Sequence, residues 1–431
     1  MSGYSVYRLE QRSPVLVGTL GELGDAFSYD SGYLARADAR PLSLSLPLGE
    51  GKFGLVEIRP YFEGLLAEGQ TRVALAAQLG LAEEDWMGLL VACGRECVGD
   101  VLICDSARLP GESGDGYVPL DAGELREMFL SDAETARENV TTRLSLAGTQ
   151  SKTALAHMPG SPIGTGWLRP VGLSASTHIL KTSHLCDLPE VEYLCMSAAA
   201  FCGMTVSQTA LLDVGNPVLA IERFDRRTLV VEGGLVVDRL HQEDMAQAAG
   251  VTGGSKYAEL EGGSVHAMAD LLRMRSVRPA RDVASLAQMI CLTFLVGNCD
   301  AHLKNYSIMH DGPARDGGAI VSLAPAYDVV STTFFPHHPR RLAMRIGDAR
   351  TVDEVTADSF RALAADLGIR DSALRRLASP LVEGLVEGVR RAGEGEFGDV
   401  LESTPYVADD LIENMMPRVG VLSEYCSGRR A

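Results

Sequence analysis

The chain has 431 residues, 46% of them hydrophobic and 22% charged, which excludes a disordered protein and leaves room for two or three cores. Its net charge of −18 argues against direct binding of nucleic-acid phosphates and suits a positively charged partner or substrate. Nine scattered cysteines without a CxxC pair are expected to be free thiols. Residues 1–8 lack a signal-peptide core and no run approaches a membrane span, so a cytoplasmic protein without a membrane partner is expected.

Residues 1–108 alternate strand-like and helical segments, which indicates one mixed N-terminal subdomain. Strands are expected at 15–18, 27–29 and 98–104, and residues 39–47 also alternate apolar and polar side chains with the period of a strand. Helical spacing covers 61–66, 71–79 and 83–91. A glycine-rich stretch at 111–116 and one acidic helix at 122–139 then form a linker region, which we place at 109–140.

Residues 141–238 form the next expected unit. The stretch 144–155 has small and polar residues between two apolar flanks, which suits a hairpin whose backbone approaches a phosphate, although the stretch by itself favours an ordinary β-turn. A strand at 178–181 ends in Lys181, and the following helix carries Glu190 and Glu192 in its first turn. This is the order of the lysine and glutamate pair that orients ATP phosphates in kinases, but an exposed lysine and acids that favour the helix dipole look the same.

The strand at 218–225 turns polar at its end, as a kinase hinge does and as any strand leaving a sheet does. Residues 239–431 are mainly helical in pattern. Helices are expected at 243–249, 266–274, 283–296, 357–367, 371–392 and 406–426. The chain therefore combines a sheet-rich first part with a helix-rich second part.

The segment 299–305 (CDAHLKN) carries the strongest chemical signal. Asp300 and Asn305 have the spacing of the protein-kinase catalytic loop, where the aspartate orients the hydroxyl and the asparagine holds magnesium. The helix before it stops at Gly297, which delivers Asp300 to a loop. Asp328 lies alone in an apolar run, a costly place unless it is paired or metal-bound, so it is the second magnesium-ligand candidate. A surface turn at 299–305 and a capping role for Asp328 are the alternatives.

Eight blocks in order resemble the HipA family of bacterial toxin kinases, which belong to type II toxin–antitoxin systems. The blocks are 39–48 (ARPLSLSLPL), 145–155 (SLAGTQSKTAL), 178–181, 192–193, 222–226 (ERFDR), 242–245, 300–305 (DAHLKN) and 327–328. The resemblance covers nearly the whole chain. It implies an α+β, two-lobed protein-kinase-like fold, in which a sheet-rich N-terminal lobe with a family-specific N-terminal subdomain precedes a helical catalytic lobe at 239–431.

The resemblance also implies ATP- and Mg-dependent serine/threonine protein kinase activity. Asp300 looks like the catalytic base, and Asn305 and Asp328 look like the magnesium ligands. The nucleotide would be bound by the phosphate loop and its neighbours Ala147, Gly148, Thr149, Gln150, Ser151, Lys152 and Lys181, by the hinge Glu222, Arg223 and Phe224, and by His302, Lys304 and Tyr327. The loop departs from the family pattern because it lacks a carboxylate just before Lys152.

Ser145 matches the serine that the family autophosphorylates to switch itself off. A phosphate there would add about −1.5 to −2 charges, which could not return to an apolar pocket and would expel the loop. The resemblance further implies a protein substrate such as an aminoacyl-tRNA synthetase, and a helix-turn-helix antitoxin through which the chain would meet DNA only indirectly. A small-molecule phosphotransferase with the same site and a catalytically silent binding module are the alternative functions.

Overall fold

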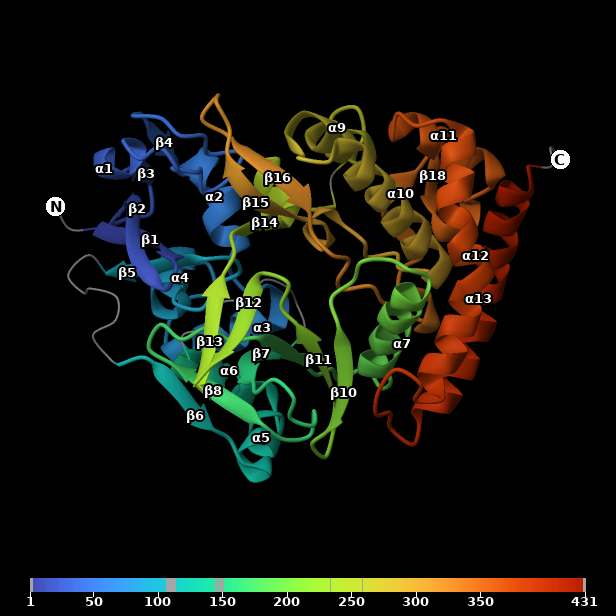
Figure 1. Ribbon diagram of the computed structural model, residues 1–431, viewed down its shortest axis with the longest axis horizontal. Helices are drawn as coiled ribbons and strands as arrows, with labels where there is room; N and C mark the ends of the chain where they lie inside the picture. Colours follow the sequence, from blue (N-terminus) through green and yellow to red (C-terminus); the bar gives the residue numbers. More distant parts are fainter. Residues whose placement is uncertain are drawn as a thin grey trace. The chain divides into compact units, whose positions relative to one another are not determined.

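The computed structural model describes residues 3–105, 114–142, 144, 146, 151–232, 234–257 and 259–428 (Figure 1). The chain folds into two compact units whose segments alternate along the sequence. Unit 1 comprises Met1–His184, Leu212–Gly253 and Met309–Ile320, and unit 2 comprises Leu185–Leu211, Gly254–Ile308 and Val321–Ala431. Unit 1 holds the two largest sheets and unit 2 the longest helices, so the expected α+β class is confirmed.

The N-terminal part of unit 1 is built on a five-stranded antiparallel sheet in the order β4-β3-β2-β1-β5. The strands are β1 (Gly3–Glu10), β2 (Ser13–Gly21), β3 (Ala26–Tyr29), β4 (Lys52–Gly54) and β5 (Val101–Asp105). Four helices accompany them: α1 (Ser31–Leu34), α2 (Leu55–Gly64), α3 (Gly69–Leu79) and α4 (Trp86–Cys93). Val6, Val17, Phe27 and Phe62 lie fully buried in the shared core, which fixes the sheet face that the helices cover.

Residues 39–47 do not form the expected strand, because only an isolated bridge joins Ser43 to Leu46. The alternating pattern arises because Leu42 and Leu46 are both fully buried. The Tyr29 hydroxyl accepts a hydrogen bond from the Leu42 N–H at 2.9 Å and donates one to the Leu46 carbonyl at 2.5 Å. One buried hydroxyl thus satisfies backbone groups that a neighbouring strand would otherwise satisfy.

A six-stranded sheet follows in unit 1, in the order β10-β11-β9-β7-β8-β6. Its strands are β6 (Gly116–Pro119), β7 (Lys152–His157), β8 (Trp167–Val171), β9 (His178–Lys181), β10 (Thr209–Asp213) and β11 (Pro217–Glu222). Leu155, Trp167, Leu180 and Val218 form its core. The central strands β7, β9 and β11 carry the sequence blocks around Lys152, Lys181 and Glu222.

The acidic helix expected at 122–139 is in fact two helices, α5 (Ala122–Met128) and α6 (Asp132–Thr142). The Ser131 hydroxyl accepts a hydrogen bond from the Glu134 N–H at 3.3 Å, as a residue that caps a helix start does. The Thr135 hydroxyl donates to the Met128 carbonyl at the end of α5, at 2.7 Å. These side-chain bonds satisfy backbone groups at the end of α5 and at the start of α6. The chain therefore forms two helices although the acidic pattern continues through the break.

The strands β12 (Arg226–Val231) and β13 (Gly234–Arg239) form a two-stranded ribbon. Other strands lie in the region after residue 238 that was expected to be mainly helical. Three of them form one sheet: β14 (Gln242–Asp244), β15 (Ser307–Pro313) and β16 (Ala319–Leu323). A further hairpin joins β17 (Arg341–Ile346) to β18 (Ala349–Thr351). The short helix α8 (Met245–Ala248) follows β14, capped by Asp244, whose carboxylate accepts from the Gln247 N–H at 2.8 Å.

Unit 2 is a helical assembly centred on α10 (Pro279–Val296) and α12 (Asp371–Gly393). Its other helices are α7 (Leu188–Phe201), α9 (Ser264–Arg275), α11 (Ala357–Asp366) and α13 (Thr404–Ser427). Helix α12 packs against α7, α10 and α13. By length and apolar composition α10 could cross a membrane, the one helix of the described ranges that passes that test, but 67% of it is buried, as in a core helix.

Candidate active site

The loop at 298–306 starts from a firmly anchored helix end. Helix α10 stops at Gly297, which adopts the left-handed conformation (φ 77°), and a Cβ at that position would overlap the Thr333 hydroxyl. Arg418 of α13 satisfies the last carbonyls of α10, with hydrogen bonds to Leu295 O at 3.0 Å and Val296 O at 3.3 Å. The helix therefore delivers the chain to the loop at a fixed point.

Asn298 ties the Asp300 backbone to the loop that carries Asp328. Its side-chain oxygen accepts a hydrogen bond from the Asp300 N–H at 3.1 Å, and its amide nitrogen donates to the Asp328 carbonyl at 3.3 Å. Asn298 is buried. No role was predicted for Asn298 from the sequence, although an asparagine directly after a helix-ending glycine was a usable signal.

The side chains of Asn305 and Asp328 meet, with Asn305 Nδ2 donating to Asp328 Oδ2 at 2.6 Å. The Asn305 side-chain oxygen also accepts from the His302 N–H at 3.1 Å. Asp328 has a φ of 57°, a left-handed conformation that a non-glycine residue adopts only where its surroundings impose it. Tyr327, next to it, shares a 2.6 Å hydrogen bond with the Ser307 hydroxyl and donates to the Lys304 carbonyl at 2.6 Å. The two segments are therefore locked together.

These residues fit a magnesium site in chemistry. Carboxylate and amide oxygens are hard ligands of the kind that Mg²⁺ takes, usually one or two from protein, with the rest from phosphates and water. The described parts of the chain hold no group of three His, Cys, Asp or Glu side chains that could bind a metal. An ion at Asn305 and Asp328 would therefore depend on a phosphate-bearing ligand to complete its coordination.

Asp300 projects from the loop and contacts Tyr257. The Tyr257 hydroxyl donates a hydrogen bond to Asp300 Oδ1 at 2.7 Å. The tyrosine ring meets the His302 ring edge-on, with centroids 5.2 Å apart, and Lys256 Nζ lies 5.2 Å from the centre of the tyrosine ring. His302 and Lys304 are themselves buried. No pattern in the sequence indicated Tyr257, because 43 positions separate it from Asp300.

In unit 1, Lys152 at the start of β7 lies directly opposite Lys181 at the end of β9. Both side chains are buried. This pairing places both lysines where the phosphate-loop segment enters the sheet. The carbonyl of Ser151, just before Lys152, accepts a hydrogen bond from the Thr182 N–H at 3.1 Å. Residues 147–150 and Ser145 lie outside the described residues.

The expected hinge lies at the end of β11, where Glu222 is paired in register with His178 of β9. The Arg223 N–H donates to the Thr177 carbonyl at 2.9 Å. The Arg223 side chain points into the protein, where it bonds Asp225 at 2.8 and 2.9 Å and Glu96 at 3.0 Å. Any contact of Arg223 with a nucleotide would therefore have to come from its backbone.

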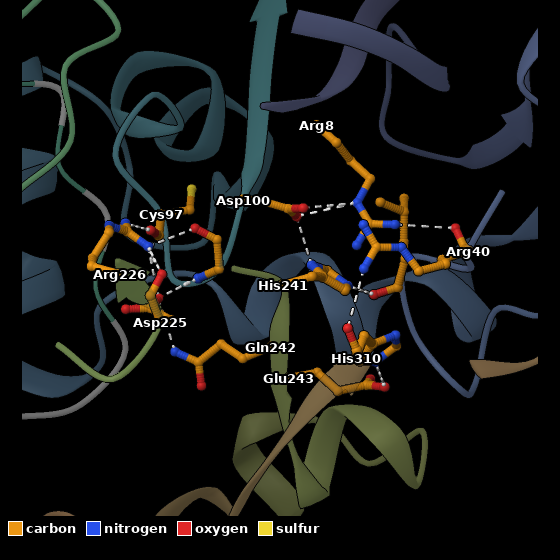
Figure 2. Close-up of polar contacts among 12 residues, drawn as sticks. Arg8, Arg40, Cys97, Asp100, Asp225, Arg226, His241, Gln242, Glu243 and His310 are labelled. Atoms are coloured by element: carbon orange, nitrogen blue, oxygen red, sulfur yellow. Dashed lines mark hydrogen bonds and ion pairs between the residues drawn. The ribbon is translucent and has the colours of Figure 1, made fainter. Parts of the chain in front are cut away.

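Arg223 belongs to a buried ionic cluster, which we define as Glu96, Arg223, Asp225, Arg226 and Arg239. Figure 2 shows Asp225 beside Arg226, with Gln242 also bonded to the Asp225 carboxylate. Burial opposes the ionisation of Glu96, but the charges of Arg239, Arg226 and Arg223 outweigh it and lower the pKa of Glu96 to about 2. Burial likewise opposes the ionisation of Asp225, and Arg223 and Arg226 hold its pKa well below the usual range. Both acids are therefore charged at neutral pH.

A second buried group lies nearby in Figure 2, where Arg8 bonds Asp100 at 3.1 Å and His241 Nδ1 lies 2.8 Å from the same carboxylate. Beyond it, Glu243 accepts hydrogen bonds from Ser43 at 2.5 Å and contacts His310 at 2.8 Å. The sequence blocks 39–48, 222–226 and 242–245 thus meet in one polar junction of unit 1. Their side chains hold the N-terminal sheet to the rest of the unit.

A helix-terminated loop with an aspartate and an asparagine five positions apart, bonded to a second aspartate on a later loop, is the arrangement of protein-kinase-like catalytic domains. The particular family follows from sequence. Residues 144–389 match the HipA-like C-terminal domain and residues 13–104 match the HipA N-terminal domain, so the chain belongs to the HipA family.

Curated relatives agree with this assignment. The chain is 36% identical over 386 residues to the putative kinase Y4mE of Sinorhizobium fredii, with 87% of each chain covered. It is 27% identical over 365 residues to the serine/threonine-protein kinase toxin HipA of Shewanella oneidensis, with 80% of each covered. Among solved structures, the HipA, HipB and operator DNA complex of Shewanella oneidensis MR-1 contains a chain that matches with a TM-score of 0.79 at 23% identity, over 99% of this chain and 100% of that one. The likeness shows the kinase-like fold.

Proposed function

We propose that this protein is an ATP- and Mg-dependent serine/threonine protein kinase of the HipA toxin type. The observation that carries the proposal is the convergence of Asp300, Asn305 and Asp328, joined by the 2.6 Å bond between the latter two and by the bridging Asn298. Relatives named as kinases support the same activity. The acceptor would be a protein of translation, such as an aminoacyl-tRNA synthetase.

In the proposed reaction Asp300 orients the acceptor hydroxyl and takes its proton while the oxygen bonds to the γ-phosphorus and the bond from that phosphorus to ADP breaks. Asn305 and Asp328 would hold the magnesium ion, which when bound neutralises charge on the phosphates. Lys152 and Lys181 would contribute positive charge to phosphate binding.

The test is phosphoryl transfer from labelled ATP in a cell lysate, with the protein and small-molecule fractions separated. Asp300→Ala should lower transfer by about 10² to 10⁴, whereas Asp311→Ala, at an exposed aspartate of β15, should have no effect. Wild-type turnover in Asp300→Ala would overturn the role of this loop. Label only in small molecules would favour a small-molecule phosphotransferase, and no binding of Mg-ATP in calorimetry would favour a silent binding module.

A helix-turn-helix antitoxin is the partner that we propose, acting with this chain in the cytoplasm. The solved HipA chain that it resembles is in complex with HipB and operator DNA. The net charge of −18 suits a basic, DNA-binding partner and makes direct DNA binding by the kinase unfavourable. Pull-down from the host should recover such a protein, and its absence together with no toxicity on expression would contradict this proposal.

Autophosphorylation of Ser145 is the regulatory part of the proposal. After incubation with Mg-ATP, peptide mass spectrometry should find phosphate on Ser145 in the wild type but not in Asp300→Ala, and the phosphorylated form should bind ATP weakly. An unmodified Ser145 in an active kinase would remove this regulation and leave the catalytic proposal standing.

A further inference from the structure

The hydrogen bond between Tyr257 and Asp300 has the geometry expected between a general base and the hydroxyl group that it deprotonates. A general base must lie about 2.6–3.2 Å from the oxygen whose proton it takes. The Tyr257 hydroxyl is 2.7 Å from Asp300 Oδ1 and donates its proton in that hydrogen bond. In the proposed reaction a serine or threonine hydroxyl would have to make the same bond to the same carboxylate.

The Tyr257 side chain also lies where it can move away from the Asp300 carboxylate. Tyr257 is 52% exposed, unlike Asn298, Asn305 and His302, which are at least half-buried parts of the loop itself. The tyrosine follows a short 3-10 turn, Gly253–Ser255, and no regular helix or strand contains it. A half-exposed side chain outside regular structure can rotate away at little cost in packing, whereas a buried support cannot.

Asp300 has a separate support that does not involve Tyr257. Its backbone is fixed by Asn298, and the loop around it is fixed by the Asn305 contacts with His302 and Asp328. The ring of the tyrosine contacts His302 and Lys256, whereas its hydroxyl makes the bond to Asp300. The residues that hold the Asp300 loop in place are therefore different from Tyr257, which is bonded to the Asp300 carboxylate.

We infer that the Tyr257 hydroxyl occupies the subsite of the acceptor hydroxyl and that a protein acceptor displaces it. This inference rests on the proposed function and adds to it the place where the serine or threonine hydroxyl binds. While Tyr257 is in place, water cannot take the acceptor position at Asp300, so hydrolysis of ATP is suppressed. When an acceptor serine replaces the tyrosine, its O–H donates to Asp300 Oδ1, and proton and phosphoryl transfer follow as above.

The test compares wild type with Tyr257→Phe, which keeps the ring and removes the hydroxyl. Two rates are measured on the full chain: hydrolysis of Mg-ATP by the protein alone, and phosphoryl transfer to dephosphorylated casein as the acceptor protein. The variant should hydrolyse ATP about two- to tenfold faster, the equivalent of one hydrogen bond, and the KM for casein should fall by a similar factor while kcat is unchanged. Tyr406→Phe, at a tyrosine of α13 that is 73% exposed, is the matched control and should behave as wild type.

A lower rate of hydrolysis in Tyr257→Phe with an unchanged KM for casein would overturn the inference, because it would make the tyrosine a positioning residue for Asp300. Equal rates in the variant and the wild type would overturn it as well. Failure of the proposed function itself looks different: Asp300→Ala would then match the wild type in both assays, whatever the result for Tyr257→Phe.

Discussion

Asp225→Asn should destabilise unit 1 strongly, because it removes one of the two acids that balance three buried arginines. In the wild type the Asp225 carboxylate accepts from Arg223 at 2.8 and 2.9 Å, from the Gly99 N–H at 2.6 Å and from Gln242 at 3.1 Å, and it pairs with Arg226 at 3.0 Å. All of these partners are donors, so the NH₂ group of an asparagine would face donors.

The expected loss follows from that geometry. The side chains of Asp225, Arg223 and Arg226 are each 1% exposed, so water cannot take the place of the missing charge. Removing one partner of a buried ion pair costs about 3–5 kcal/mol of unfolding free energy. Asp238→Asn is the matched control, because Asp238 pairs at 3.1 Å with Arg227, whose side chain is 64% exposed, and such pairs contribute at most about 1 kcal/mol.

Urea unfolding followed by tryptophan fluorescence measures the difference in unfolding free energy between the two variants, and it reports on unit 1. The chain has two tryptophans, Trp86 in α4 and Trp167 in β8, and both belong to unit 1. The pKa of Asp225 is lowered from 3.8, so its contribution to the free energy of unfolding is complete above pH 3.8 and is lost as the pH falls through the folded-state pKa. The difference in unfolding free energy between wild type and Asp225→Asn should therefore be constant from neutral pH to about pH 5 and become smaller in more acid solution.

Adding Arg223→Met to Asp225→Asn should recover part of the loss, because it removes one of the charges left without a counter-ion. The reasoning would be refuted if Asp225→Asn cost no more than Asp238→Asn, or if its deficit grew as the pH fell. Either result would mean that the buried ionic cluster does not bear on the stability of unit 1.

Three further predictions concern unit 2. Asn298→Ala should lower the rate of phosphoryl transfer by about 10²-fold with the fold retained by circular dichroism, because both Asp300 and Asp328 lose a tether and small displacements of reacting groups are costly; an unchanged kcat would contradict this. Gly297→Ala should lower the thermal midpoint, since left-handed backbone costs a residue with a Cβ about 1–2 kcal/mol before the overlap with Thr333 is counted. Chelation with EDTA should abolish labelling from ATP, and readdition of Mg²⁺ should restore it; labelling that persists in EDTA would exclude Asn305 and Asp328 as metal ligands.

Features determined by nearby residues were predictable from the sequence. The end of α10 at Gly297 and the loop that follows it depend on the glycine and the apolar run before it. Asp328 was singled out because a lone acid in an apolar segment needs a partner, a signal that lies in its immediate neighbours. Which residue that partner is, Asn305, came only from the structure.

Features determined by distant residues were not predictable. Residues 39–47 alternate like a strand because Leu42 and Leu46 are buried, but the hydroxyl of Tyr29 takes the place of a partner strand. The break of the acidic segment 122–139 at Ser131 is, by contrast, a local feature, which was missed because the acidic pattern continues through the two side chains that cap the helix ends there. Tyr257 meets Asp300 only through the fold of unit 2, and no spacing in the sequence reports such a contact.

The alternation of the two units along the chain has a consequence for synthesis on the ribosome. The sheet β14-β15-β16 and the pair of Glu243 with His310 need the segment Met309–Ile320, and Arg40 of the N-terminal part donates to the His310 carbonyl at 3.1 Å. Domains generally fold as they emerge, N-terminal parts first. Unit 1 cannot do so here, because its last segment is translated after the Asp300 loop. A chain that ends before residue 309 would therefore lack part of unit 1 although it already contains the Asp300 loop.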